Sequence, residues 1–85
     1  MKYRKKPIVI EAFRYLAEEP PNWFLSGIVN GLISVNISKE SCTIKTLEGN
    51  MSARRGDWII KGTANELYPC KNKVFEDCYE LVGEE

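Results

Sequence analysis

Histidine is absent from this sequence of 85 residues. Without an imidazole the chain cannot form a Ser-His or Cys-His catalytic pair, and it lacks a common ligand of zinc and non-haem iron. Cysteine is scarce too, and the three cysteines form no CxxC spacing. That number and spacing fit neither a disulfide framework nor a thiolate zinc site. The sequence therefore predicts a protein with no metal and no cofactor.

Long apolar runs and phosphate-binding glycine loops are also missing. The six glycines form neither a GxGxxG pattern nor a Walker loop. After a basic start, the apolar run of residues 8–10 ends at Glu11, which is too short for the apolar region of a signal peptide. No stretch approaches the roughly 18 apolar residues of a membrane span. We expect a soluble protein of the cytoplasm that has no membrane partner.

The chain has no net charge, because 12 Lys and Arg residues balance 12 Asp and Glu residues. General nucleic-acid binding is not expected, since phosphate contacts need a surplus of cations. The charge is uneven along the chain, however. Residues 1–14 hold five cations and one carboxylate, while residues 74–85 hold five carboxylates and no cation. The two termini either attract each other, within one chain or between subunits, or leave a basic surface for an anionic ligand.

The length predicts one domain, residues 1–85, with a thin core, because a chain of this size buries only roughly 60% of its unfolded surface. Alternating β-branched and aromatic residues from Lys6 to Tyr15 predict a central strand. Turn residues then separate several short strands, whose spacing predicts a meander. These are residues 32–38, 42–47, 50–55, 57–62 and 66–71.

Helical patterns flank this run of strands. Trp23 and the apolar residues after it predict one main helix near residues 21–30, with Gly31 as its C-cap. Asn72 is expected to cap a shorter helical segment, and residues 79–83 to return to the sheet. Together these patterns predict an α+β fold: a small, twisted, mostly antiparallel sheet, either open or barrel-like, with one main helix.

Several carboxylates lie in or beside predicted turns. Glu48, Gly49 and Asn50 supply one hairpin turn, and Gly56 with Asp57 supplies another. A pair of such carboxylates can act as acid and base or hold a magnesium ion. The simpler interpretation is that Asp57 bonds to the backbone of its own turn. We therefore expect that the protein is not an enzyme.

The cysteines near the C-terminus have two interpretations. Cys70 and Cys78 are expected to be small buried hydrophobic side chains. The alternative is a pair of reactive thiols, favoured by the nearby cations Lys71 and Lys73. Nothing else in the local sequence lowers the pKa of a thiol, so burial is the preferred interpretation.

Nine aromatic side chains are more than so small a core can enclose, so some must reach the surface. Period-2 alternation places Trp58 and Ile60 on one face of their strand and Ile59 and Lys61 on the other. An exposed aromatic ring beside Lys or Arg can stack on a base while the cation holds a phosphate. It can equally form a subunit interface or pack in the core.

Three collinear stretches, which together cover over half of the chain, carry a resemblance. They are MKYRKKPIVIEAF, TLEGNMSARRGDWIIKG and NELYPCKNKVFEDCYE. The chain resembles a family of small, largely uncharacterised proteins encoded by phages and prophages. Family members tend to carry proline before the Gly-Asp pair, where Arg55 stands here. The resemblance implies a phage accessory protein in the cytoplasm of an infected host cell.

Three functions suit such a protein without catalytic residues. The first is a counter-defence sponge, a homo-oligomer that sequesters a small anionic nucleotide immune signal, such as a cyclic dinucleotide, between subunits. The second is a protein inhibitor of a host or defence enzyme, and the third is a structural phage component. The sponge predicts phosphate contacts from Arg4, Lys5, Lys6, Arg14, Arg54 and Lys61, and base stacking on Tyr3, Trp23, Trp58 and Tyr68.

Overall fold

A computed structural model describes residues 1–4 and 6–83 of the chain. Lys5, one of the predicted ligand-binding residues, lies outside the described residues. The elements in chain order are β1 (Glu11–Arg14), α1 (Asn22–Val29), β2 (Ile33–Asn36), β3 (Ser41–Thr46), β4 (Gly49–Arg54), β5 (Trp58–Lys61), β6 (Leu67–Cys70) and α2 (Asn72–Cys78).

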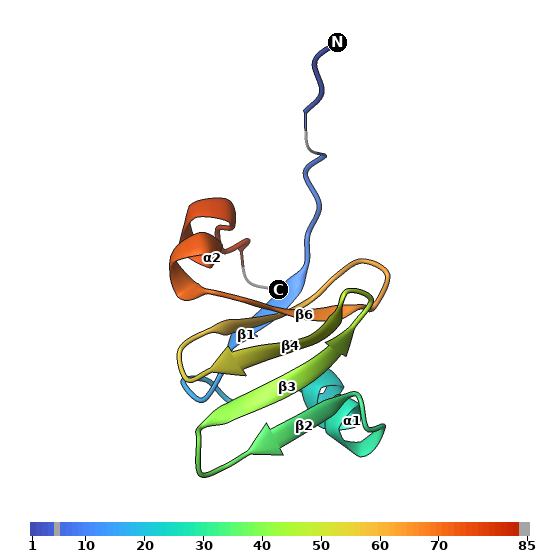
Figure 1. Cartoon of the computed structure of the whole chain (residues 1–85). Helices are drawn as coiled ribbons and strands as arrows, with labels where there is room; N and C mark the ends of the chain where they lie inside the picture. Colours follow the sequence, from blue (N-terminus) through green and yellow to red (C-terminus); the bar gives the residue numbers. More distant parts are fainter. Residues whose placement is uncertain (5, 84–85) are drawn as a thin grey trace.

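The six strands form two antiparallel sheets, as Figure 1 shows. The first sheet has the order β1-β5-β6, and the second has the order β2-β3-β4. The predicted α+β class, the antiparallel pairing and the main helix are confirmed. In the described chain the strands divide between two sheets, because β5 pairs with the distant β1 rather than with β4.

The first strand is shorter than the sequence predicts, and its expected central position is wrong. β1 covers only Glu11–Arg14 and lies at an edge of the first sheet. Residues 6–10 have the composition of a strand, but no described strand pairs with them. Ile8 and Val9 are accordingly 55% and 71% exposed. Apolar alternation indicates that a segment can pair, and only a partner strand makes it do so.

Helix α1 lies close to its predicted position. It begins after Pro21, whose extended backbone precedes the first turn, and it ends before Gly31 at φ +83°. Phe24 and Gly27 face inward. A Cβ atom on Gly27 would lie 2.7 Å from Cδ1 of Ile33, so the missing side chain lets the helix approach β2 closely.

Two predicted turns are confirmed. Gly49 begins β4 with φ +101° after a hairpin whose last strand pair is Thr46 with Gly49. Gly56 has φ +90° in the turn before β5. Residues that carry a side chain rarely adopt such backbone φ angles, which explains why glycine occupies both positions.

Arg55 bridges separate loops beside the Gly56 turn. Its guanidinium donates to both carboxylate oxygens of Glu40 at 3.0 Å and to the carbonyl of Leu16 at 3.0 Å. The pKa of Glu40 is lowered by these hydrogen bonds and by the charge of Arg55. The side chain of Arg55 therefore ties the β2–β3 loop to the loop after β1.

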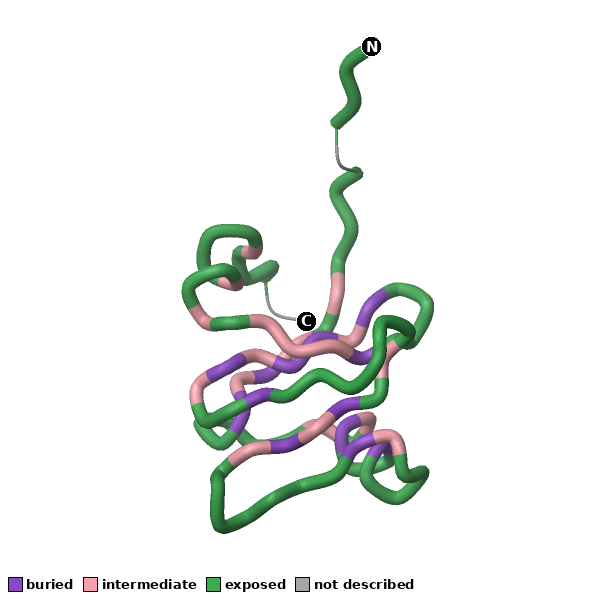
Figure 2. The backbone as a smooth tube through the Cα atoms, in the orientation of Figure 1, coloured by how far each residue is buried: buried purple, intermediate pink, exposed green. Residues whose placement is uncertain are grey.

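The core consists of side chains from both sheets and α1. Figure 2 colours the buried residues purple along the backbone. Phe13 meets Phe24 edge to face, with ring centroids 5.0 Å apart. The buried Tyr15 donates its hydroxyl to the carbonyl of Ser41 at 3.3 Å. Burial raises the pKa of Tyr15 to about 12. The other core residues are Ile33, Cys42, Ile44, Ala53, Ile59 and Leu67.

The C-terminal part departs from prediction in two respects. Asn72 lies inside α2, Lys71 is the N-cap, and no side chain caps the helix. Residues 79–83 form no strand, so the expected return to the sheet is wrong for the described tail. Leu81 is 96% exposed, so its side chain has no apolar cover.

Candidate functional site

The first sheet presents apolar residues on both of its faces. Antiparallel register places Trp58 opposite Arg14, and Ile60 opposite both Ala12 and Tyr68. Residues directly opposite each other share a face, so these side chains form the outer face of the sheet, away from the main core. The predicted alternation of Trp58 and Ile60 against Ile59 and Lys61 is confirmed, since Ile59 packs in the core. Ile60 is also fully buried, so the outer face is covered as well.

Helix α2 supplies part of that cover through a stack of aromatic rings. The ring of Phe75 lies 3.9 Å from that of Trp58 at an interplanar angle of 6°. Tyr79 continues the stack on Phe75 at 4.9 Å and 25°. The indole N–H of Trp58 donates to Oδ1 of Asn72 at 2.8 Å. The amide of Asn72 is thus engaged with Trp58 rather than with the helix N-terminus.

A groove of about 360 Å³ opens beside this stack. We call it the aromatic groove, and define it by Ile8–Ile10, Trp58, Phe75, Glu76, Tyr79 and Glu80, with the exposed tail residues Leu81 and Val82 alongside. Its walls are aromatic and aliphatic, and its ionisable groups are carboxylates. Such a groove favours an apolar segment that carries positive charge.

The predicted turn role of Asp57 is confirmed. The side chain is 8% exposed, and its Oδ2 accepts the backbone N–H of Arg54 at 2.9 Å. The same oxygen lies 3.1 Å from Nζ of Lys71. Asp57 therefore joins the Gly56 turn to the start of α2.

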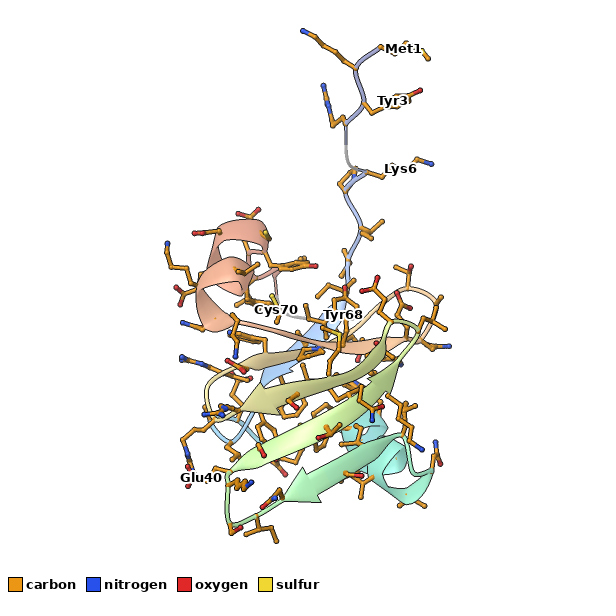
Figure 3. All side chains as sticks on the ribbon, in the orientation of Figure 1. Met1, Tyr3, Lys6, Glu40, Tyr68 and Cys70 are labelled. Atoms are coloured by element: carbon orange, nitrogen blue, oxygen red, sulfur yellow. The ribbon has the colours of Figure 1, made fainter. Side chains whose placement is uncertain are left out.

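Residues 1–4 and 6 form what we call the basic arm, drawn away from the body in Figures 1 and 3. Tyr3 is 87% exposed. Within the described part of the chain, Lys2, Arg4 and Lys6 form no ion pair. Three of the predicted ligand-binding residues, Tyr3, Arg4 and Lys6, thus stand together on a segment that contributes nothing to the core.

Four further predicted residues make side-chain contacts within the fold: Arg14, Trp23, Trp58 and Lys61. Arg14 donates from Nε to the carbonyl of Gly56 at 2.9 Å. Trp23 donates from Nε1 to Oε1 of Glu11 at 3.1 Å, and the other oxygen of Glu11 lies 4.0 Å from Nζ of Lys61. These contacts orient the side chains and leave them less free for a ligand.

One copy of the chain does not gather all the predicted residues at one place. Arg14, Trp58 and Tyr68 share the outer face of the first sheet, whereas Lys61 points to the opposite face. Arg54 is exposed at the end of β4, on the second sheet. The basic arm is separate from all of these.

A second hollow, of about 640 Å³, lies between the β3–β4 hairpin and the β5–β6 loop. Its lining is largely apolar, and its ionisable groups include Lys45, Glu48 and Glu66. Tyr68 also lines it, and burial raises the pKa of this phenol to about 12. Two carboxylates beside one cation make this hollow a poor site for a phosphate.

The expected burial of both C-terminal cysteines is wrong, because Cys78 is exposed and Cys70 is partly buried. Cys42 is the buried one. Burial raises the pKa of Cys42 and of Cys70, which makes these thiols less nucleophilic at neutral pH. In residues 1–4 and 6–83, no three Cys, Asp or Glu side chains are grouped so that they could hold a metal ion.

Sequence reasoning missed the α2 side of the aromatic groove. Phe75 and Tyr79 are four residues apart in the sequence. In a helix this i, i+4 spacing places both rings on one face. Nothing in the sequence places Trp58 beneath that face. The carboxylates Glu76 and Glu80 read as part of an acidic terminus, and only the fold brings them to the rim.

No model of a known protein family matches this chain, and no curated protein or solved structure is significantly similar to it. In the described residues, no helix has the length and apolar character needed to cross a membrane. The observations above thus define an α+β protein with a basic arm and a carboxylate-rimmed aromatic groove.

Proposed function

We propose that the protein is a non-enzymatic phage accessory protein that counters host defence by sequestering an anionic nucleotide signal, such as a cyclic dinucleotide, between copies of the chain. The phage origin rests on the resemblance of three sequence stretches. The binding role rests on one observation, the exposed basic arm. Its phenol and its cations are held by no part of the described body.

The residue types of the arm suit a nucleotide. The guanidinium of Arg4 and the ammonium of Lys6 can each bind phosphate oxygens, and the ring of Tyr3 can stack on a base. An isolated arm offers no enclosed site, however. Two arms brought together by association supply two rings and two sets of cations, which match a ligand with two bases and two phosphates.

The two hollows of a single copy do not serve this purpose. Each has carboxylates among its lining residues, Glu76 and Glu80 in one and Glu48 and Glu66 in the other. These charges repel phosphate. The nucleotide site therefore belongs between copies, where the arms and not the hollows meet the ligand.

A thermal-shift series with mono-, di- and trinucleotide signals tests this proposal. A ligand that binds only the folded oligomer, at a hundredfold excess over its Kd, stabilises it by about 2.7 kcal/mol. The shift should disappear in an Arg4→Glu variant and persist in Lys39→Glu, a matched charge reversal at an exposed residue of the β2–β3 loop. Bound nucleotide should be recovered intact after heat denaturation.

Two results would overturn the proposal. If no nucleotide raises the melting temperature, the arm does not bind this class of ligand. If the recovered nucleotide is hydrolysed, the protein is an enzyme and not a sponge.

The aromatic groove favours a second candidate, inhibition of a host or defence enzyme by direct contact. Exposed apolar residues beside Glu76 and Glu80 form the surface that a basic segment of another protein would bind. Two results together would favour this candidate over the sponge. The wild-type protein inhibits a partner enzyme and binds no nucleotide, and the double variant Glu76→Lys, Glu80→Lys no longer inhibits that enzyme.

A further inference from the structure

We infer that the occupant of the aromatic groove is the basic arm of a second copy of this chain, so that two copies exchange their arms. This inference deepens the oligomeric part of the proposed function. Its test reads molecular mass and not nucleotide binding, so that either idea can fail without the other.

Apolar surface at the groove is the first reason. Ile8 and Val9 are 55% and 71% exposed at its mouth, and Leu81 and Val82 are 96% and 56% exposed beside it. The arm itself carries the exposed side chains of Met1 and Tyr3. Contiguous apolar surface of this kind marks an interaction site. Stacking two such surfaces removes both from water.

Charge complementarity is the second reason. The described cations of the arm are Lys2, Arg4 and Lys6, and the carboxylates of the groove are Glu76 and Glu80. None of these five groups forms an ion pair in the described chain. Three cations against two carboxylates leave each docked arm with surplus positive charge.

The course of the chain explains why the arm does not fill its own groove. Residues 8–10 line the groove, and the described residues of the basic arm lie away from the body in Figure 1. Pro7 restricts the residue before it to extended conformations. An extended backbone at Lys6 continues this course away from its own α2.

The arm is long enough to reach a neighbouring copy. The six residues before Pro7 can span at most about 20 Å, at roughly 3.3 Å per residue of extended chain. Both the groove and the base of the arm lie beside residues 8–10. A two-fold axis next to that segment places each arm over the groove of the other copy, and it closes the assembly as a dimer.

Charge reversal on each side, alone and combined, tests the exchange. The arm variant carries Arg4→Glu and Lys6→Glu, and the groove variant carries Glu76→Lys and Glu80→Lys. Each replaces exposed side chains, so the fold should be retained, and far-ultraviolet circular dichroism checks this. A control with Lys39→Glu and Lys45→Glu changes the net charge as the arm variant does, on the second sheet and its loop.

Sedimentation equilibrium should show a dimer for the wild-type protein and the control. Each one-sided variant should dissociate with a Kd raised about tenfold or more, the equivalent of about 1.4 kcal/mol. An equimolar mixture of the arm variant and the groove variant should form heterodimers, because the carboxylates at positions 4 and 6 of one copy then face the ammonium groups at positions 76 and 80 of the other, and the unchanged arm faces the unchanged groove. A chain that carries all four reversals should dimerise again by itself.

Three results would overturn the inference. The first is a wild-type protein that stays monomeric at about 100 μM, a concentration well above the Kd of a specific dimer. The second is a dimer that neither one-sided variant weakens. The third is dimerisation restored in the chain with four reversals but absent from the mixture, which would mean that the charges act within one copy.

Discussion

Phe75→Ala should release α2 from the first sheet while the rest of the fold stays intact. A helix of seven residues is too short to persist alone in water, so α2 depends on the surface beneath it. Its described anchors are the stack of Phe75 on Trp58 at 3.9 Å, the hydrogen bond from Trp58 to Asn72, and the ion pair of Lys71 with Asp57.

The magnitudes show which anchor dominates. Removing a partly buried phenyl ring exposes on the order of 100 Å² of apolar surface, which costs about 2.5 kcal/mol at 25 cal/mol per Å². The lost stacking on Trp58 adds about 0.5–1.5 kcal/mol. The hydrogen bond to Asn72 is worth about 1 kcal/mol. The ion pair of the largely exposed Lys71 is worth at most about 1 kcal/mol. The stabilisation lost with the Phe75 ring exceeds the stabilisation that the hydrogen bond and the ion pair still supply. We therefore expect α2 to be mostly undocked in Phe75→Ala.

Hydrogen exchange measured residue by residue checks this expectation. Amides of α2 should lose their protection, whereas those of β3 and β5 keep theirs. In a Trp23→Phe background, the emission of Trp58 should shift to longer wavelength as its ring meets water. Val74→Ala, at a 51% exposed position of the same helix, is the matched control and should change neither signal.

The reasoning is refuted if α2 keeps its protection and Trp58 its emission in Phe75→Ala. It is refuted equally if β3 and β5 lose protection together with α2, because the helix would then be an integral part of the cooperative fold.

Two further predictions concern the core. Ile59→Ala, at a fully buried position, should lower the free energy of unfolding by about 2–5 kcal/mol in urea denaturation, while the same change at the 86% exposed Ile37 should cost under about 0.5 kcal/mol. Equal effects would contradict the core assignment. Because the pKa of Tyr15 is raised from 10.0 to about 12 in the folded protein, its contribution to stability is complete below pH 10 and is lost as the pH rises toward 12. Tyr15→Phe should flatten that decline in pH-dependent unfolding, and an unchanged decline would contradict it.

Much of the fold follows from local signals in the sequence. The apolar residues after Pro21 predict α1, and its observed span Asn22–Val29 lies within the expected range. Gly49 and Gly56 mark turns because a positive φ is costly for other residues. These features depend on neighbours within a few residues, so the sequence contains the information needed to predict them.

Predictions of features that depend on distant parts of the chain, such as strand pairing and burial, were wrong in several places. Residues 6–10 have the pattern of β1, yet no described strand pairs with them, and β1 lies at an edge of the first sheet rather than at its centre. Cys42 is buried and Cys78 is exposed, although both are short apolar thiols in the sequence. Burial is a property of what lies opposite a residue, and local composition does not specify it.

The candidate site shows the same division. By itself the sequence determined the inventory: no imidazole, a basic N-terminus, an acidic C-terminus and an excess of aromatic residues. Tertiary structure alone decided that Trp58 lies under Phe75, and that Glu76 and Glu80 rim a groove at the base of the arm. The physical reason is that composition and period act along the chain, whereas a groove forms where β1, β5 and α2, far apart in sequence, are packed together.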